Sequence, residues 1–277
     1  MVKNIFKSLF WVALYFILQT VGLLGVFFYD LFSQNLVFTD IQNADLFYEE
    51  LMNYLYGIAL PGLLVGAIVY FGIFIIYKLI RKHPFDFKTI NYNKLLMCLC
   101  IGWILNVVVT ILINVFALVL PESITNALND STALALEGFP LWFTLLATGI
   151  CVPILEELVF RYGICGIMGR KNALVGLIVS SVIFGLVHGN PIQIVYATAL
   201  GFVFGYIYLK HGNIWYPIML HMAVNSSSVL VSSLEAPWLY GVFVALAVVN
   251  IVILIKQEPE LKNFFKKGAY SEQFEIE

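Results

Sequence analysis

The sequence predicts an all-α fold, a polytopic transmembrane helical bundle of about eight spans. Of its 277 residues, 61% are hydrophobic and 12% are charged, whereas a soluble domain is about 45–50% apolar and about 25% charged. Disordered chains need low hydrophobicity and a high net charge, and the formal net charge here is −2. The same charge balance excludes a basic surface for nucleic acid. The expected surroundings of the chain are therefore a lipid bilayer.

Apolar runs of about 17–25 residues are candidate spans, because one crossing needs about 20 residues. Turn-forming residues such as Pro121, Gly169 and Gly189 separate the later runs. The predicted spans are 9–29, 53–77, 96–120, 142–168, 172–189, 191–209, 213–232 and 238–255. We expect one integral-membrane domain over residues 1–277, with a motif-bearing core at about 140–232.

The distribution of basic residues predicts the orientation of these spans. Lys and Arg favour the cytoplasmic side of a membrane protein. With eight spans and a cytoplasmic N-terminus, all 15 Lys and Arg residues fall on that side. We therefore expect a multi-pass cell-membrane protein with both termini in the cytoplasm. The cytoplasmic segments would include the connections 78–94, 169–171 and 210–212 and the tail 256–277. The apolar core of the first span is longer than that of a signal peptide, so we expect it to remain as a helix.

Small residues inside the spans indicate helix packing. The four cysteines lie in apolar stretches and match neither a disulfide framework nor a zinc-ribbon spacing, so we interpret them as packing residues. The pairs Gly62–Gly66 and Gly201–Gly205 have the spacing of close helix contacts.

Ionisable side chains inside the spans are the informative exceptions, because each costs about 2.5–3.5 kcal/mol at the centre of a span. With the accompanying asparagine they are Glu156, Glu157 and Arg161 in the fourth span, His188 in the fifth, and His221 and Asn225 in the seventh. A rise of about 1.5 Å per residue brings them to one layer in the middle of the membrane. The sequence therefore predicts a site inside the bundle, wetted by a cavity.

Helical spacing sorts these groups into pairs. Glu157 and Arg161 are four residues apart and share one helix face, so they can form an ion pair. Glu156 is turned about 100° away and is therefore the carboxylate less neutralised by Arg161. His221 and Asn225 are also four residues apart and share a face.

This set of side chains suits the activation of a water molecule. A desolvated carboxylate holds a proton more readily than one in water, which suits a general base near neutral pH, and a histidine can share that proton. A second histidine and an amide can donate hydrogen bonds to a developing oxyanion. Hydrolysis of a peptide bond needs these functions. Alternatively, Glu156, His188 and His221 have the chemistry of zinc ligands.

Three motifs follow one another on separate predicted spans. They are Glu156-Glu157-x-x-x-Arg161, Phe184-x-x-x-His188 and His221-x-x-x-Asn225. In type, order and placement they resemble the intramembrane endopeptidases of the CAAX prenyl-protease and bacteriocin-processing family, also called abortive-infection proteases. The resemblance covers residues 150–230 in detail.

The resemblance implies a glutamate-dependent endopeptidase that needs no cofactor, with zinc as the alternative. By it, Glu156 activates water with the help of His188, while His221 and Asn225 bind the oxyanion. Glu157 would complete the catalytic set as an accessory member. The implied substrate is a membrane-associated protein or peptide.

The same resemblance implies structural or accessory roles for Arg161 and Phe184. Other interpretations of the motifs stay open at this point. Glu157 and Arg161 could be a purely structural pair, and His188 could be a loop histidine. His221 and Asn225 could be hydrogen-bonding glue between helices.

Two whole-protein functions compete with a protease. One is a non-catalytic membrane regulator or bacteriocin-immunity protein that acts through a regulatory membrane partner. The other is a transporter that relays protons through mid-span carboxylates, although the sequence shows neither internal repeats nor paired broken helices.

Two prolines precede the motif residues. Pro153 and Pro217 stand three and four residues before Glu156 and His221. A proline frees a backbone carbonyl and can bend a span, which would help to open the predicted cavity.

Overall fold

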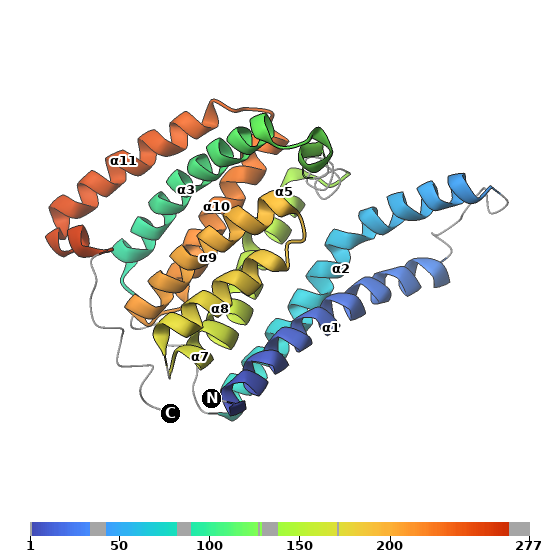
Figure 1. Cartoon of the computed structure of the whole chain (residues 1–277), viewed down its shortest axis with the longest axis horizontal. Coiled ribbons are helices and arrows are strands. Elements are labelled where there is room, and N and C mark those ends of the chain that lie inside the picture. Colours follow the sequence, from blue (N-terminus) through green and yellow to red (C-terminus); the bar gives the residue numbers. More distant parts are fainter. Residues whose placement is uncertain are drawn as a thin grey trace.

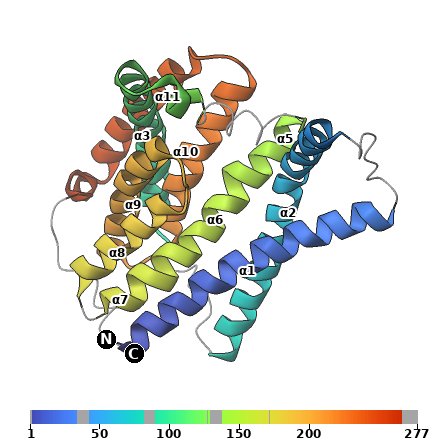
Figure 2. The same cartoon turned by 45° about the vertical axis from the view of Figure 1, so that its right-hand side comes forward.

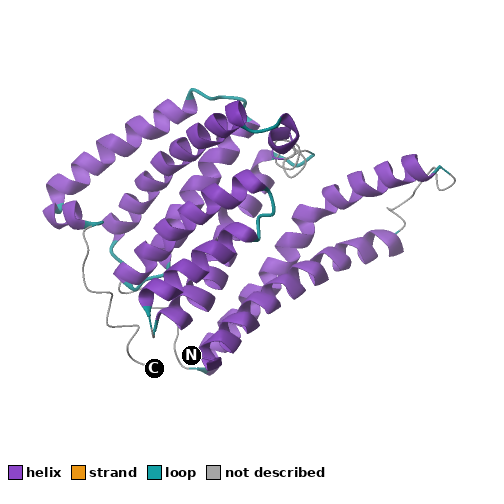
Figure 3. Ribbon diagram, viewed as in Figure 1, coloured by secondary structure: helices purple, strands orange, loops and turns teal. Residues whose placement is uncertain are grey.

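The computed structural model describes residues 2–33, 43–81, 90–126, 128, 138–170 and 172–265. Over these ranges the chain is helical and contains no strand, which confirms the all-α prediction (Figure 3). The long helices are α1 (Val2–Phe32), α2 (Ala44–Ile80), α3 (Tyr92–Val119), α8 (Ala173–Leu186), α9 (Pro191–His211), α10 (Trp215–Ser233) and α11 (Leu239–Gln257).

Residues 141–169 form one continuous helical rod of changing pitch (Figure 2). Its segments are α5 (Leu141–Thr144), the π-helix η1 (Leu145–Cys151), α6 (Val152–Glu157), the π-helix η2 (Leu158–Gly166) and α7 (Ile167–Gly169). In a π-helix each amide bonds to the carbonyl five residues earlier, and such stretches occur frequently at functional sites. The two π-helices flank α6, the segment that carries Glu156 and Glu157.

Each of the eight predicted spans corresponds to a helix or to this composite rod. In the described part of the chain, six helical segments are long and apolar enough to cross a membrane. The two others are α8, which has only 14 residues, and α10, which has 19 residues but includes His221, Asn225 and several serines. The chain thus forms a helical membrane bundle. The short helix α8 and the more polar helix α10 both belong to its motif-bearing half.

The fifth predicted span, 172–189, ends earlier than predicted. Helix α8 stops at Leu186, so His188 lies in the turn that follows and not inside a helix. The reason is the Gly-Asn-Pro sequence. Gly189 takes a left-handed backbone conformation with φ 75°, and the Asn190 side chain accepts hydrogen bonds from the first amides of α9.

Basic residues gather at one end of the bundle. Helices α1 and α3 begin, and α2 and α11 end, at this same end (Figure 1). Lys78, Lys210 and Lys256 stand in the last turns of α2, α9 and α11. The predicted clustering is therefore present, while the side of the membrane that this end faces stays a prediction. The tail begins with a short 3-10 helix, η3 (Pro259–Asn263), and residues 266–277 lie outside the described ranges.

Helices α1 and α2 form a hairpin that packs against the rod through only part of its length (Figures 1 and 2). Their crossing depends on glycines, because a Cβ on Gly22 would collide with the Gly62 carbonyl, and one on Gly66 would meet the Leu18 carbonyl at 2.6 Å. The close packing predicted for Gly62 and Gly66 is therefore confirmed. On the other side of the rod, α8, α9 and α10 pack against it, and α3 and α11 pack on α10 and on each other.

Candidate active site

The predicted site residues lie on elements that pack against one another around the rod. Glu156 and Glu157 end α6, and Arg161 follows in η2. Helix α10, which carries His221 and Asn225, packs on η1 and α6, while α8 packs on η2.

The centre of the site is a fully buried ion pair. Arg161 Nε lies 2.9 Å from Glu157 Oε2, and neither side chain is exposed. Arg161 Nη1 donates to the Ser180 hydroxyl at 2.9 Å, and this hydroxyl donates to the Phe160 carbonyl at 2.7 Å. The guanidinium also stacks over the Phe184 ring, 4.7 Å from its centroid. The predicted pairing of Glu157 with Arg161 is thus confirmed, within a network that fixes both side chains.

His221 joins the two glutamates. Its Nδ1 donates to Glu157 Oε1 at 3.0 Å, and its Nε2 faces Glu156 Oε2 at 3.7 Å. The ring rests on Phe204, with 4.8 Å between centroids, and meets Phe184 edge-on. A carboxylate that holds Nδ1–H fixes both the orientation and the tautomer of an imidazole, so Nε2 is directed at Glu156.

The two adjacent glutamates have different surroundings. Glu157 is completely buried, whereas Glu156 keeps 9% of its surface. Glu157 is engaged by both Arg161 and His221 at hydrogen-bonding distance, whereas the Glu156 oxygen lies 3.7 Å from His221, too far for a direct hydrogen bond. Glu156 is therefore the carboxylate that has capacity left for a water molecule.

His188 is oriented by the helix that precedes it. Its Nδ1 lies 2.7 Å from the Phe184 carbonyl. A carbonyl only accepts, so Nδ1 carries the proton, and Nε2 of the neutral ring carries the lone pair that can take one. Among the described residues, no hydrogen bond joins His188 to Glu156, so the predicted cooperation between them requires a water or substrate atom between the two side chains.

Asn225 is anchored to the rod. Its Nδ2 donates to the Thr148 carbonyl in η1 at 3.1 Å, and the neighbouring Ser226 hydroxyl donates to the Gly149 carbonyl at 3.2 Å. The amide has a second N–H, for which the described residues offer no partner. The structure thus places both predicted oxyanion donors on one face of α10, each held by a different part of the rod.

Three contributors to the site were not predicted. Ser180 precedes Phe184 by four residues and His188 by eight, so the helical period could have indicated it. Phe204 was indistinguishable from the other aromatic residues of an apolar helix. The Thr148 carbonyl is a backbone group, and only the proline at 153 hinted that a carbonyl there lacks its usual partner.

The zinc alternative was tested against the arrangement of the side chains. No group of three or more His, Cys, Asp or Glu in the described ranges is placed to hold a metal ion, and this includes Glu156, His188 and His221. Nδ1 of both histidines is engaged, which leaves Nε2 as the ring atom that could bind a metal. The described residues as arranged do not form a zinc site.

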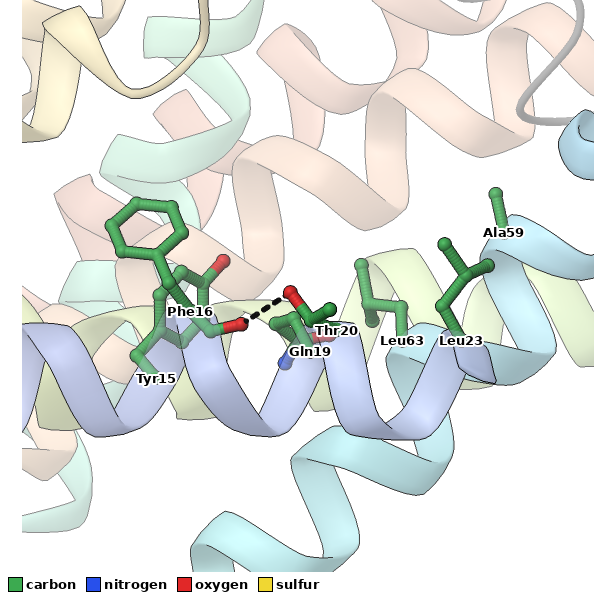
Figure 4. A pocket seen from close by; sticks show the side chains of 7 residues that line it. All are labelled: Tyr15, Phe16, Gln19, Thr20, Leu23, Ala59 and Leu63. Carbon is green, nitrogen blue, oxygen red and sulfur yellow. Dashed lines mark hydrogen bonds between the residues drawn. The ribbon is translucent and has the colours of Figure 1, made fainter. Parts of the chain in front are cut away.

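A groove of about 310 Å³ lies between α1 and α2 (Figure 4). Its lining residues are Tyr15, Phe16, Gln19, Thr20, Leu23, Ala59 and Leu63. Most of the lining is apolar. Tyr15 also packs edge-on against Phe160. One lining residue of the groove therefore contacts the rod at the residue before Arg161.

Comparison with known proteins gives three matches. The family described as type II CAAX prenyl endopeptidase Rce1-like matches residues 138–227, the range that holds all three motifs. The putative membrane peptidase YdiL of Bacillus subtilis is 38% identical over 87 residues, which cover 31% of this chain and 36% of YdiL. The UPF0177 protein YxdF of Lactococcus lactis is 32% identical over 131 residues, which cover 45% of this chain and 73% of YxdF. No solved structure gives a significant match.

Proposed function

The chain belongs to the CAAX prenyl-protease and bacteriocin-processing family, and on that premise we propose that it is an intramembrane endopeptidase with Glu156 as its general base. One observation carries the proposal. Glu156 is a buried carboxylate with capacity for a water molecule, and it faces a histidine whose orientation is fixed by the Glu157–Arg161 pair. A structural pair alone would not need the second glutamate.

In the proposed reaction, Glu156 takes a proton from a water molecule as the water oxygen attacks the carbonyl carbon of the peptide bond. His188 Nε2 accepts a hydrogen bond from the same water. Glu156 then returns the proton to the leaving amine. The roles of base and acid thus fall to one carboxylate at successive steps.

The oxyanion of the tetrahedral intermediate needs hydrogen-bond donors. Asn225 can supply its second N–H, because the first is held by the Thr148 carbonyl. His221 can donate from Nε2 only when it is protonated on both nitrogens, since Nδ1–H already points at Glu157. Glu157 holds the Nδ1–H of His221 and so fixes the direction of Nε2. We therefore assign Glu157 the task of orienting His221.

The proposed substrate is a membrane-associated protein or peptide. The groove between α1 and α2 supports this assignment, because its lining is largely apolar and includes Tyr15, which packs on Phe160 of the rod. Such a lining suits an apolar segment lying in the bilayer. We further propose that the protein works in the cell membrane with both termini in the cytoplasm and without a cofactor.

The test is cleavage of a reporter polypeptide by the purified protein in proteoliposomes. Glu156→Gln should abolish cleavage, because glutamine keeps the shape and lacks the basic oxygen. The control is Glu122→Gln, the same change at an exposed residue, which should cleave normally. Near-normal turnover by Glu156→Gln would reject the glutamate-base mechanism. If the wild type itself does not cleave and Glu156→Gln keeps its cellular effect, the protein acts as a non-catalytic regulator and the proposal is wrong.

A further inference from the structure

Two backbone carbonyls inside the rod accept hydrogen bonds from another helix. The Thr148 carbonyl accepts from Asn225 Nδ2, and the Gly149 carbonyl accepts from Ser226 Oγ. Carbonyls in the interior of a helix ordinarily accept from amides of their own helix. A feature of the sequence must therefore leave these two carbonyls of η1 without an amide donor from the rod itself.

The explanation lies in the amide that is missing at residue 153. In η1 each amide donates to the carbonyl five residues earlier, and the last such bond runs from Val152 N–H to Ala147. The next in the series would run from residue 153 to Thr148, but Pro153 has no N–H. In the α-helical pattern that follows, the amide for Gly149 would also be that of residue 153. The same proline therefore deprives both patterns of a donor.

The contact also requires close approach of α10. A Cβ added at Gly149 would lie 2.8 Å from Ser226 Oγ and 3.4 Å from Ser226 Cα. Glycine at this position lets the backbone of the rod come within reach of the short serine side chain. Pro153 and Gly149 thus act together, the first by leaving carbonyls without a donor and the second by leaving room.

We propose that Pro153 is a positioning residue for Asn225: its missing amide leaves the Thr148 carbonyl to anchor one N–H of the Asn225 side chain, so that the other N–H is held ready for the oxyanion. Pro153 touches no reacting atom in this account. The catalytic consequence rests on the function proposed above, whereas the anchoring of Asn225 does not.

The first test measures kinetics of Pro153→Ala, which restores an N–H that competes with Asn225 for the carbonyl. We expect kcat to fall about 10- to 100-fold with KM unchanged, a smaller loss than the 10²–10³-fold typical of deleting an oxyanion donor. Asn225→Ala should lower kcat by a smaller factor in the Pro153→Ala background than in the wild type. Full kcat in Pro153→Ala would overturn the proposal.

The second test needs no substrate. A double-mutant cycle on the melting temperature in detergent compares Asn225→Ala in the wild type and in Pro153→Ala. The loss in melting temperature should be smaller in Pro153→Ala, because the carbonyl then has a backbone donor. Additive losses would contradict the anchoring. Pro61→Ala, which removes the proline inside α2, is the matched control and should be additive with Asn225→Ala.

The two tests separate the two proposals. Coupling in the melting cycle without any peptidase activity in the wild type would leave the anchoring intact and reject the function. Activity with additive melting losses would reject the anchoring and leave the function. If Pro153→Ala does not fold, Gly149→Ala approaches the same contact from the other side. Its methyl group should push Ser226 away and lower kcat at unchanged KM, and normal kcat in this variant would overturn the proposal.

Discussion

The Arg161 side and the Glu156 side of the candidate site differ in burial and in the number of bonds that hold their charged side chains. On the Arg161 side, the guanidinium is fully buried, forms an ion pair with Glu157 and donates a hydrogen bond to Ser180. On the Glu156 side, the carboxylate keeps some exposure and adjoins the hairpin of α1 and α2, which packs less closely on the rod. The difference shows how a membrane protein can keep one glutamate fixed while its neighbour stays available for chemistry.

The largest effect on folding is expected from Arg161→Ala, which removes the cation of the buried ion pair with Glu157. Removing one partner of a buried ion pair leaves an uncompensated charge and costs about 3–5 kcal/mol. We expect much less folded protein in detergent and a lower melting temperature. Lys256→Ala, the loss of an exposed cation, should change neither. Normal yield and stability of Arg161→Ala, with activity abolished, would contradict the structural role and would assign Arg161 a role in catalysis.

Asn225→Ala tests the proposed oxyanion donor, which belongs with Glu156 in the proposed reaction. Loss of an oxyanion donor should lower kcat by about 10²–10³-fold with little change in KM. Asn250→Ala is a matched control, because Asn250 is also a helical asparagine that donates to a backbone carbonyl, that of Leu246, but it lies on α11 away from the site. A rise in KM at constant kcat for Asn225→Ala would mean ground-state binding and contradict the assignment.

Much of the fold was predictable because hydrophobic length and helical period are local properties. The predicted spans match the helices within a few residues, apart from the longer α1 and α2 and the early end of α8. The Glu157–Arg161 pair was predictable for the same reason, since both residues belong to one helix face. The contact between Glu157 and His221 was not, because 64 residues separate them and nothing local fixes the rotation of α10 against the rod.

The π-helical segments of the rod were also not predictable from the sequence. The hydrogen bonds of a π-helix join residues five apart instead of four, and a π-helix leaves no hydrophobic pattern of its own in an apolar run. The two π-helices nevertheless flank α6, which packs on α10. Pro153 was recognised as a residue that frees a carbonyl, but the side chain that would use this carbonyl was not predictable.

Ser180→Ala tests the hydrogen bonds around Arg161 and should have a smaller effect than Arg161→Ala. It takes an acceptor from Arg161 and a donor from the Phe160 carbonyl, so we expect a loss of stability of about 1–3 kcal/mol. Turnover per folded molecule should be nearly unchanged. Ser181→Ala is the matched control on the same helix, because the Ser181 hydroxyl donates back to the Leu177 carbonyl of α8 itself. Equal losses for both variants would mean that the network around Arg161 has no special weight.

No effect at all is expected from metal removal. No group of three or more His, Cys, Asp or Glu in the described part of the chain is placed to hold a metal ion, so we expect activity of the purified protein to survive chelation in a preparation shown to be metal-depleted. Loss of activity on chelation with recovery on zinc addition would contradict the cofactor-free mechanism and would require His188 or His221 to rearrange as ligands.

The most direct test of the account compares Glu156→Gln with Glu157→Gln in one preparation, by turnover per folded molecule and by melting temperature. The account predicts that Glu156→Gln loses turnover and keeps its melting temperature, because only the basic oxygen is lost. Glu157→Gln should lower the melting temperature, because the Arg161 charge loses its counter-ion, and should keep measurable turnover. The opposite pattern, a stable and inactive Glu157→Gln beside an active Glu156→Gln, would contradict the assignment of the base to Glu156.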